Sequence, residues 1–233
     1  MNKLDRIKQA QLEQGDKGEE NPYQPLASGL PVVANITDKD LAHYQAALSA
    51  DLARLATIKD VVEKAKLKQQ LLPTYLPFVQ DYIKQGHNYP NDVAVRVAIW
   101  LFDTLDIENG LEIALHLIAQ QQITPPKFDR DLPTFVCDAM YDWANALLKL
   151  EQSASPYLDF FVSSFEDWEL APPVKSKLYA ILAKHKKREG DWLNVLALCE
   201  KAEQVNPEGA GVKTLKLEAQ SKLKPAEPEL TAE

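Results

Sequence analysis

Apolar residues in this chain recur every three or four positions, in segments that prolines separate at short intervals. Such spacing indicates amphipathic helices, and proline is tolerated in a helix mainly in the first turn, where its missing N–H would have no partner anyway. The prolines between these segments are Pro73, Pro125, Pro126, Pro133, Pro156, Pro172, Pro173 and Pro207. With only eight glycines in 233 residues, the composition also favours helices over sheets. We therefore predict an all-α fold.

A long helix is predicted near the N-terminus, from about residue 38 to residue 70. Its apolar residues recur every seven positions, at Leu41, Leu48, Leu55 and Val62. This spacing suits packing against the body of the protein, and it also suits a coiled coil between subunits. Pro73 then fits the first position of a new helix, and Pro77 would kink or restart that helix one turn later. We expect a bend between a long arm and the body.

A compact array of antiparallel helical hairpins is predicted after this bend. Residues 92–122 form one hairpin, and further helices are expected after Pro133 and Pro156. In the last hairpin, residues 177–207, several residues occupy positions that a tetratricopeptide unit requires: Leu182, Ala183, Gly190, Trp192, Ala202 and Pro207. One such unit cannot bury its own apolar face, so the pattern supports a tetratricopeptide-like helix pair more than a solenoid.

Charge is distributed unevenly along the chain. Residues 73–172 hold five Lys and Arg against fifteen Asp and Glu, whereas residues 173–224 hold eleven against six. We therefore divide the chain into five regions: a mostly disordered arm (1–36), a long helix that serves as an oligomerisation or DNA-facing arm (37–72), an acidic helical body (73–172), a basic hairpin with a last helix (173–224) and a disordered acidic tail (225–233).

No motif in the sequence specifies a catalytic or metal site. A glycine-rich phosphate loop is absent, and the histidines and cysteines lack metal-ligand spacing. Two acidic groups have the residue types that bind Mg²⁺, Asp138 with Asp142 and Asp103 with Asp106 and Glu108, but solvated helix faces and caps produce the same pattern. We predict no catalytic residues, no metal and no cofactor for this chain.

Two distant cysteines and no long apolar run predict a soluble protein of a reducing compartment.

Two basic stretches are the candidates for contact with nucleic acid. The net charge of −8 argues against a generic nucleic-acid coat, so any polyanion-binding surface must be local. The predicted DNA-binding residues are Lys64, Lys66, Lys68, Lys184, Lys186, Lys187 and Arg188. Lysines near the end of a helix also complement its dipole and keep it hydrated, which is the alternative explanation for both stretches.

Four segments together resemble the small terminase subunit of temperate tailed phages with cohesive-end genomes. They are LLPTYLPFVQDYI, DVAVRVAIWLFDTLDIENGLEIALHLI, TPPKFDRDLPTFVCDAM and REGDWLNVLALCEKAEQVNPEGAGVKTLKLE. The resemblance spans roughly residues 40–224, and the family is also described as the endonuclease subunit of terminase. No residue of this chain matches a catalytic motif, so the resemblance assigns no catalytic residue.

The resemblance implies a subunit that recognises the packaging (cohesive-end) site on concatemeric viral DNA. It would recruit or regulate the large terminase subunit, to which Mg²⁺ and ATP are expected to bind. The expected partners are this subunit, viral double-stranded DNA and further copies of the chain in a homo-oligomeric ring, with no membrane. The expected location is the host bacterial cytoplasm, not the mature virion. The endonuclease and ATPase activities would belong to the terminase complex, without an active site in this chain.

The C-terminus departs from the family pattern. Members of that family tend to end in a Lys- and Arg-rich tail, whereas this chain ends in PAEPELTAE, so DNA affinity must come from elsewhere.

Two alternative functions follow from the residues themselves. One is a tetratricopeptide-like helical adaptor that binds a protein partner without DNA contact. The other is a metal-dependent nuclease that uses the acidic groups at Asp103 or Asp138.

Overall fold

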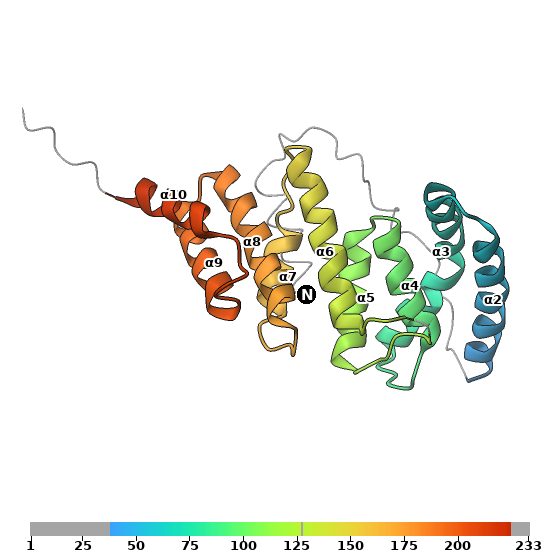
Figure 1. The fold of residues 1–233 in the computed structure, drawn as a ribbon. Helices are drawn as coiled ribbons and strands as arrows, with labels where there is room; N and C mark the ends of the chain where they lie inside the picture. The colour runs from blue at the N-terminus through green and yellow to red at the C-terminus, as the bar shows by residue number, and fades with distance from the viewer. Residues whose placement is uncertain (1–37, 127, 225–233) are drawn as a thin grey trace, which may run out of the picture. The chain divides into compact units, whose positions relative to one another are not determined.

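The computed structural model describes residues 38–126 and 128–224, and within these ranges the regular structure is helical, without strands (Figure 1). The helices are α2 (Asp38–Thr57), α3 (Val61–Lys84), α4 (Asp92–Asp103), α5 (Ile107–Ala119), α6 (Leu132–Lys149), α7 (Tyr157–Ser164), α8 (Pro172–Glu189), α9 (Trp192–Val205) and α10 (Lys213–Leu223). The all-α prediction is confirmed. The predicted arm (1–36) and tail (225–233) lie outside the described residues.

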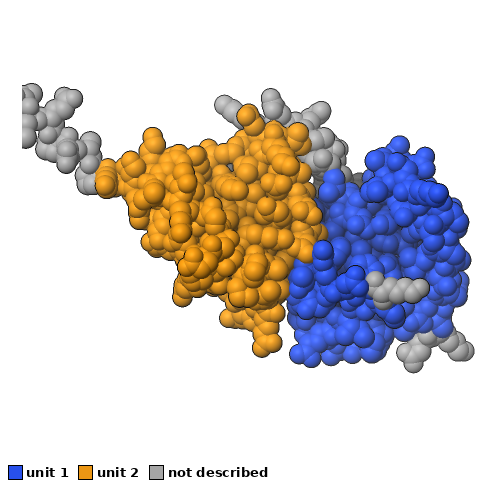
Figure 2. Space-filling model, viewed as in Figure 1, with its two compact units in different colours: residues 1–136 blue, residues 137–233 orange. Residues whose placement is uncertain are grey.

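The chain divides into two compact units, unit 1 (Met1–Val136) and unit 2 (Cys137–Glu233) (Figure 2). The division falls within α6. This division differs from the five regions that the charge distribution predicts, and those regions stay a prediction.

Among the described residues, no helix combines the length and the apolar character that crossing a bilayer requires.

The single helix predicted over residues 38–70 is interrupted in the structure. α2 ends at Thr57, and α3 begins at Val61 and continues through both Pro73 and Pro77. Asp60 caps α3, because its side chain accepts a hydrogen bond of 2.8 Å from the Glu63 N–H. The break therefore lies at residues 58–60, and the helix start expected at Pro73 is wrong, while the bend expected there stays a prediction.

α3 tolerates two prolines because they lie away from its buried face. Pro73 is exposed and Pro77 is partly exposed. The carbonyl of Gln69, which loses its helical donor at Pro73, also belongs to an exposed residue, so water can reach it. An interior proline costs about 3 kcal/mol, whereas each large buried side chain contributes about 1.5–3 kcal/mol. The buried apolar side chains of α3 outweigh that cost: Leu72, Tyr75, Leu76, Phe78, Val79 and Tyr82.

The hairpin predicted over residues 92–122 is present in unit 1 as α4 and α5. Asn91 caps α4 by accepting a hydrogen bond of 3.0 Å from the Ala94 N–H. At the turn, Leu105 adopts a left-handed φ of 63°, and the Asp106 N–H donates to the Leu101 carbonyl at 2.9 Å. α4 is buried on nearly every side and forms the core of unit 1, and Arg96 is its one charged residue between Val93 and Phe102.

Unit 2 contains the predicted C-terminal hairpin as α8 and α9, followed by α10. Gly190 supplies the left-handed φ of 75° that the turn requires, and the Asp191 N–H donates to the Lys186 carbonyl at 3.0 Å. α9 packs between its two sequence neighbours, α8 and α10. The helix pair is therefore confirmed, while its tetratricopeptide-like character stays a prediction.

Candidate nucleic-acid interface

The end of α8 holds four of the predicted DNA-binding residues, Lys184, Lys186, Lys187 and Arg188. Cations at a helix C-terminus are stabilised by the helix dipole. To neutralise a DNA phosphate, however, a cation that an anion or carbonyl of the protein already holds must give up that contact. The partners of each side chain therefore decide which residues are available.

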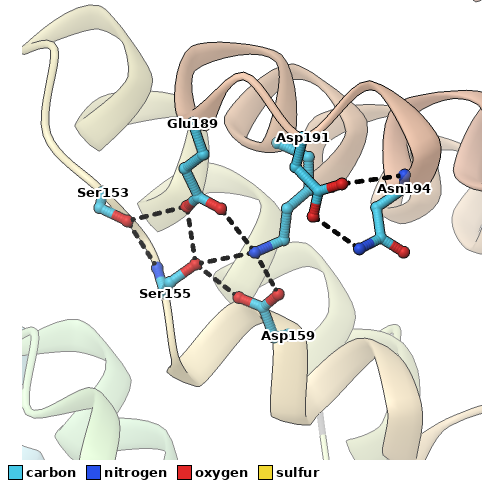
Figure 3. A network of polar contacts seen from close by, with 7 residues as sticks. Ser153, Ser155, Asp159, Glu189, Asp191 and Asn194 are labelled. Atoms are coloured by element: carbon cyan, nitrogen blue, oxygen red, sulfur yellow. Dashed lines mark hydrogen bonds and ion pairs between the residues drawn. The ribbon is translucent and has the colours of Figure 1, made fainter. Parts of the chain in front are cut away.

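Lys186 is held inside a polar network that joins α8 to α7. Figure 3 shows Ser155, Asp159 and Glu189 of this network. Its Nζ lies 2.7 Å from Asp159 Oδ1 and 2.7 Å from Glu189 Oε2. Ser155 Oγ completes the network at 2.6 Å from Asp159 Oδ2 and 3.0 Å from Glu189 Oε1. Burial lowers the pKa of Lys186, but its hydrogen bonds to the two carboxylates outweigh burial and raise that pKa overall. Lys186 is a structural cation of unit 2.

Arg188 caps the C-terminal end of α6. One guanidinium nitrogen donates to the Gln152 carbonyl at 2.8 Å, and the other donates to the Glu151 carbonyl. Glu151 adopts a left-handed φ of 60°, and the Gln152 N–H donates back to the Leu147 carbonyl at 2.9 Å. The planar guanidinium thus satisfies two carbonyls that the end of the helix leaves without helical donors. Phosphate binding by Arg188 would remove this cap.

Lys184 and Lys187 are more available than their neighbours. Lys187 Nζ lies 2.6 Å from Glu218 Oε2 on α10, but both side chains are well exposed, and such a pair contributes only about 0–1 kcal/mol. Lys184 is exposed and has no partner among the described residues. His185 between them is buried and lies 2.9 Å, through Nε2, from the Ala144 carbonyl. Burial lowers the pKa of His185, so it adds little positive charge at neutral pH.

The second predicted stretch lies on the first half of α3 in unit 1. Lys68 Nζ forms an ion pair of 2.5 Å with Asp103 Oδ2 on α4. Lys66 is exposed and Lys64 is partly buried, and neither has a partner among the described residues. Lys64 and Lys68, four residues apart, line the same cavity together with Arg96. The structure therefore brings two of the three lysines together and places Lys66 outside the cavity lining.

Arg96 is the residue that the sequence analysis missed. The available signal was a single charge within the apolar run VAVRVAIWLF, which is unusual for a buried helix. Sequence spacing could not show that Arg96 faces the lysines of α3, because that contact depends on how α3 and α4 pack.

The acidic groups considered for a nuclease have partners of their own. Asp103 is paired with Lys68, and Asp138 Oδ1 lies 2.6 Å from Lys177 Nζ. Asp106 caps α5 through the Asn109 N–H at 3.3 Å. In the described part of the chain, no three His, Cys, Asp or Glu side chains are grouped so that they could hold a metal ion.

Comparisons with known proteins agree on one family. The model of the phage small terminase subunit family matches residues 45–171. The probable terminase endonuclease subunit of Haemophilus phage HP1 is 32% identical over 146 residues, which are 62% of this chain and 52% of that protein. The terminase endonuclease subunit of Escherichia phage P2 is 30% identical over 179 residues, which are 76% of this chain and 72% of that protein. The match thus spans about half the length of the HP1 protein. No solved structure matches the chain significantly.

Proposed function

Because the chain belongs to the phage small terminase subunit family, we propose that it recognises the packaging (cohesive-end) site on concatemeric viral DNA. In this proposal it also recruits or regulates the large terminase subunit, which cuts and packages the DNA. The observation that carries the proposal is the family match over residues 45–171, which begins in α2 and ends directly before α8. Such a subunit acts in the cytoplasm of the infected bacterium and is not expected in the mature virion.

The DNA contacts that we propose are the available cations among the seven predicted residues. These are Lys64, Lys66, Lys184 and Lys187, because phosphate binding there breaks no strong contact within the chain. Lys68, Lys186 and Arg188 stabilise the fold through partners that DNA would have to displace. A net charge of −8 makes each single contact weak, so the affinity must come from several sites acting together.

Assembly into a homo-oligomeric ring would supply that multiplicity. When several copies in one ring bind the same DNA molecule, the first contact raises the effective concentration at which the remaining contacts form. The start of α3 carries exposed apolar surface, with Val61 exposed at 77% and Val62 at 61%. Two adjacent apolar side chains exposed to this degree suit a contact with another subunit. We therefore propose that the α2–α3 turn takes part in subunit contacts.

A second candidate function is cutting by this chain itself, because both relatives carry the word endonuclease in their names. A metal site at Asp103 or Asp138 would first have to displace Lys68 or Lys177. We therefore propose that cutting belongs to the large subunit, with Mg²⁺ and ATP as its cofactors. If purified chain with Mg²⁺ nicks DNA, and Asp103→Asn or Asp138→Asn abolishes nicking, this chain holds the active site instead.

The experiment that tests the packaging role is a reconstituted cutting assay. Concatemeric DNA of the same phage is incubated with the large subunit, ATP and Mg²⁺, with and without this chain. The proposal predicts cutting at the cohesive-end site that depends on this chain. Equally rapid and equally site-specific cutting by the large subunit alone would contradict it.

A further inference from the structure

We propose that a cavity of about 210 Å³ in unit 1 binds a phosphate group through Lys64 and Arg96. The cavity is lined by α2, α3, α4 and the segment before α6: Leu52, Leu55, Ala56, Lys64, Lys68, Arg96, Ile99, Trp100, Asp103 and Phe128. Its volume exceeds that of several water molecules. The proposal rests on the proposed function as far as the phosphate belongs to the DNA backbone.

The charges that line this cavity do not balance. Three cations, Lys64, Lys68 and Arg96, face a single carboxylate, that of Asp103. Asp103 is already bound to Lys68 at 2.5 Å. Asp103 also interacts electrostatically with Arg96, but one carboxylate can balance only one of the three cations, so two positive charges of the lining are left in excess. An anion in the cavity would neutralise charge that the fold itself leaves in excess.

Arg96 shows most directly that an acceptor is missing. Its Nε is buried and has no hydrogen-bond partner among the described residues. A buried donor of a charged group is costly to leave unsatisfied, so native structures rarely contain one without a reason. Burial lowers the pKa of Arg96, against the opposing effect of Asp103 and Asp92, yet a guanidinium keeps its charge at any physiological pH. A bound oxyanion would accept from this Nε–H.

The surroundings of Arg96 suit a phosphate. The Arg96 Cζ lies 5.0 Å from the centre of the Phe128 ring, and this contact helps to hold the guanidinium in place. A held guanidinium with a nearby ammonium group provides several directed donors for a tetrahedral oxyanion. The apolar part of the lining, which includes Leu55, Ile99 and Trp100, strengthens the attraction by lowering the local dielectric constant.

The cluster at the end of α8 provides the contrast within the same chain. There, Lys186 and Arg188 find acceptors in the protein itself, at Asp159 and at the Gln152 carbonyl. In unit 1, the buried Arg96 Nε–H and the Lys64 side chain, which line the same cavity, have no acceptor among the described residues. A phosphate of DNA or free phosphate can satisfy both groups, and the two sources can be separated by experiment.

The first arm of the test uses inorganic phosphate on the full chain at constant ionic strength. The NMR resonance of the Arg96 Nε–H, assigned by its loss in Arg96→Lys, should shift saturably as phosphate is added. Lys64→Gln should weaken this response several-fold. Lys84→Gln removes the same charge from the exposed end of α3 and should leave the response unchanged. No shift in the wild type, or an equal response in Lys64→Gln, overturns the phosphate site.

The second arm measures binding of a cohesive-end duplex across a salt series. Lys64→Gln and Arg96→Lys should each weaken binding, and Lys64→Gln should reduce the salt slope by about 1, whereas Lys84→Gln should do neither. A response to inorganic phosphate with unchanged DNA binding in both variants overturns the DNA backbone as the source and identifies free phosphate. If the wild type binds no DNA at all, the proposed function fails, and the phosphate arm alone decides whether the cavity is a phosphate site.

Discussion

Lys186 Nζ lies 2.7 Å from Asp159 Oδ1, and this ion pair joins the densest basic stretch of the chain to α7. The same nitrogen lies 2.7 Å from Glu189 Oε2, so one cation serves two carboxylates. High charge density in the sequence is therefore not the same as charge available to a ligand.

Replacing Lys186 with Met should lower the free energy of unfolding by about 1–2 kcal/mol, because Asp159 and Glu189 lose their shared cation. Lys184→Met is the matched control, since this exposed residue has no partner in the described structure, and it should change stability by less than about 0.5 kcal/mol. Urea denaturation of the two variants measures the difference. Equal effects would show that the network contributes nothing to stability.

Arg188 should be replaceable neither by Gln nor by Lys. Both variants should lose about 1–2 kcal/mol of stability, because neither side chain can donate in a fixed plane to the Glu151 and Gln152 carbonyls at once. Hydrogen exchange at the C-terminal end of α6 should accelerate in both. Full stability in Arg188→Lys would mean that only the charge of Arg188 matters.

Acidification should destabilise the protein before its carboxylates titrate. Burial lowers the pKa of His116 and of His185, so both bind protons less readily in the folded chain than in the unfolded chain. The stability that these two neutral histidines contribute is therefore fully present above their unfolded pKa of about 6.5. It is lost as the pH drops from there towards their folded pKa.

Denaturation midpoints between pH 7 and pH 5.5 measure this effect. His116→Gln should flatten the dependence in part, since Gln can still accept from the Gln120 side chain that His116 contacts at 2.9 Å. His43→Gln is the control, because His43 is exposed. A pH dependence that remains the same in His116→Gln would rule out His116 as a contributor.

Pro77→Ala should stabilise α3. The substitution restores an N–H inside a continuous helix and removes the ~3 kcal/mol cost of an interior proline. Part of this gain is offset because the unfolded chain becomes more flexible without the proline, so the free energy of unfolding should rise by about 2 kcal/mol. Gln80→Ala, at an exposed position of the same helix, is the control and should have little effect. If Pro77→Ala destabilises the protein in thermal or urea unfolding, the proline must be needed for the packing of α3.

Local signals in the sequence predicted the fold well where they agreed with one another. The hairpin of α4 and α5 has the Asn91 cap, a continuous apolar pattern and a polar turn, and it was predicted correctly. The break before α3 was missed because two prolines are a stronger local signal than the single cap at Asp60. Their cost was overridden by tertiary burial of the opposite face of α3, which no local pattern reveals.

The candidate site was less predictable, because its properties depend on distant partners. The sequence identifies Lys186 and Arg188 as basic, but their partners lie 27 and 36 residues away, at Asp159 and Gln152. The left-handed turn at Glu151, which exposes the carbonyls that Arg188 binds, carries no glycine to signal it. Arg96 was missed for the same reason, since its role depends on lysines brought together by the packing of α3 against α4.

The measurement that tests the central claim most directly is binding of the purified chain to the cohesive-end DNA of its own phage and to unrelated DNA, across a salt series, with particle mass recorded in the same samples. The account predicts an oligomer that prefers the cohesive-end site and whose affinity falls steeply with salt. A monomer that binds neither DNA would contradict it and would favour a helical adaptor that acts through a protein partner.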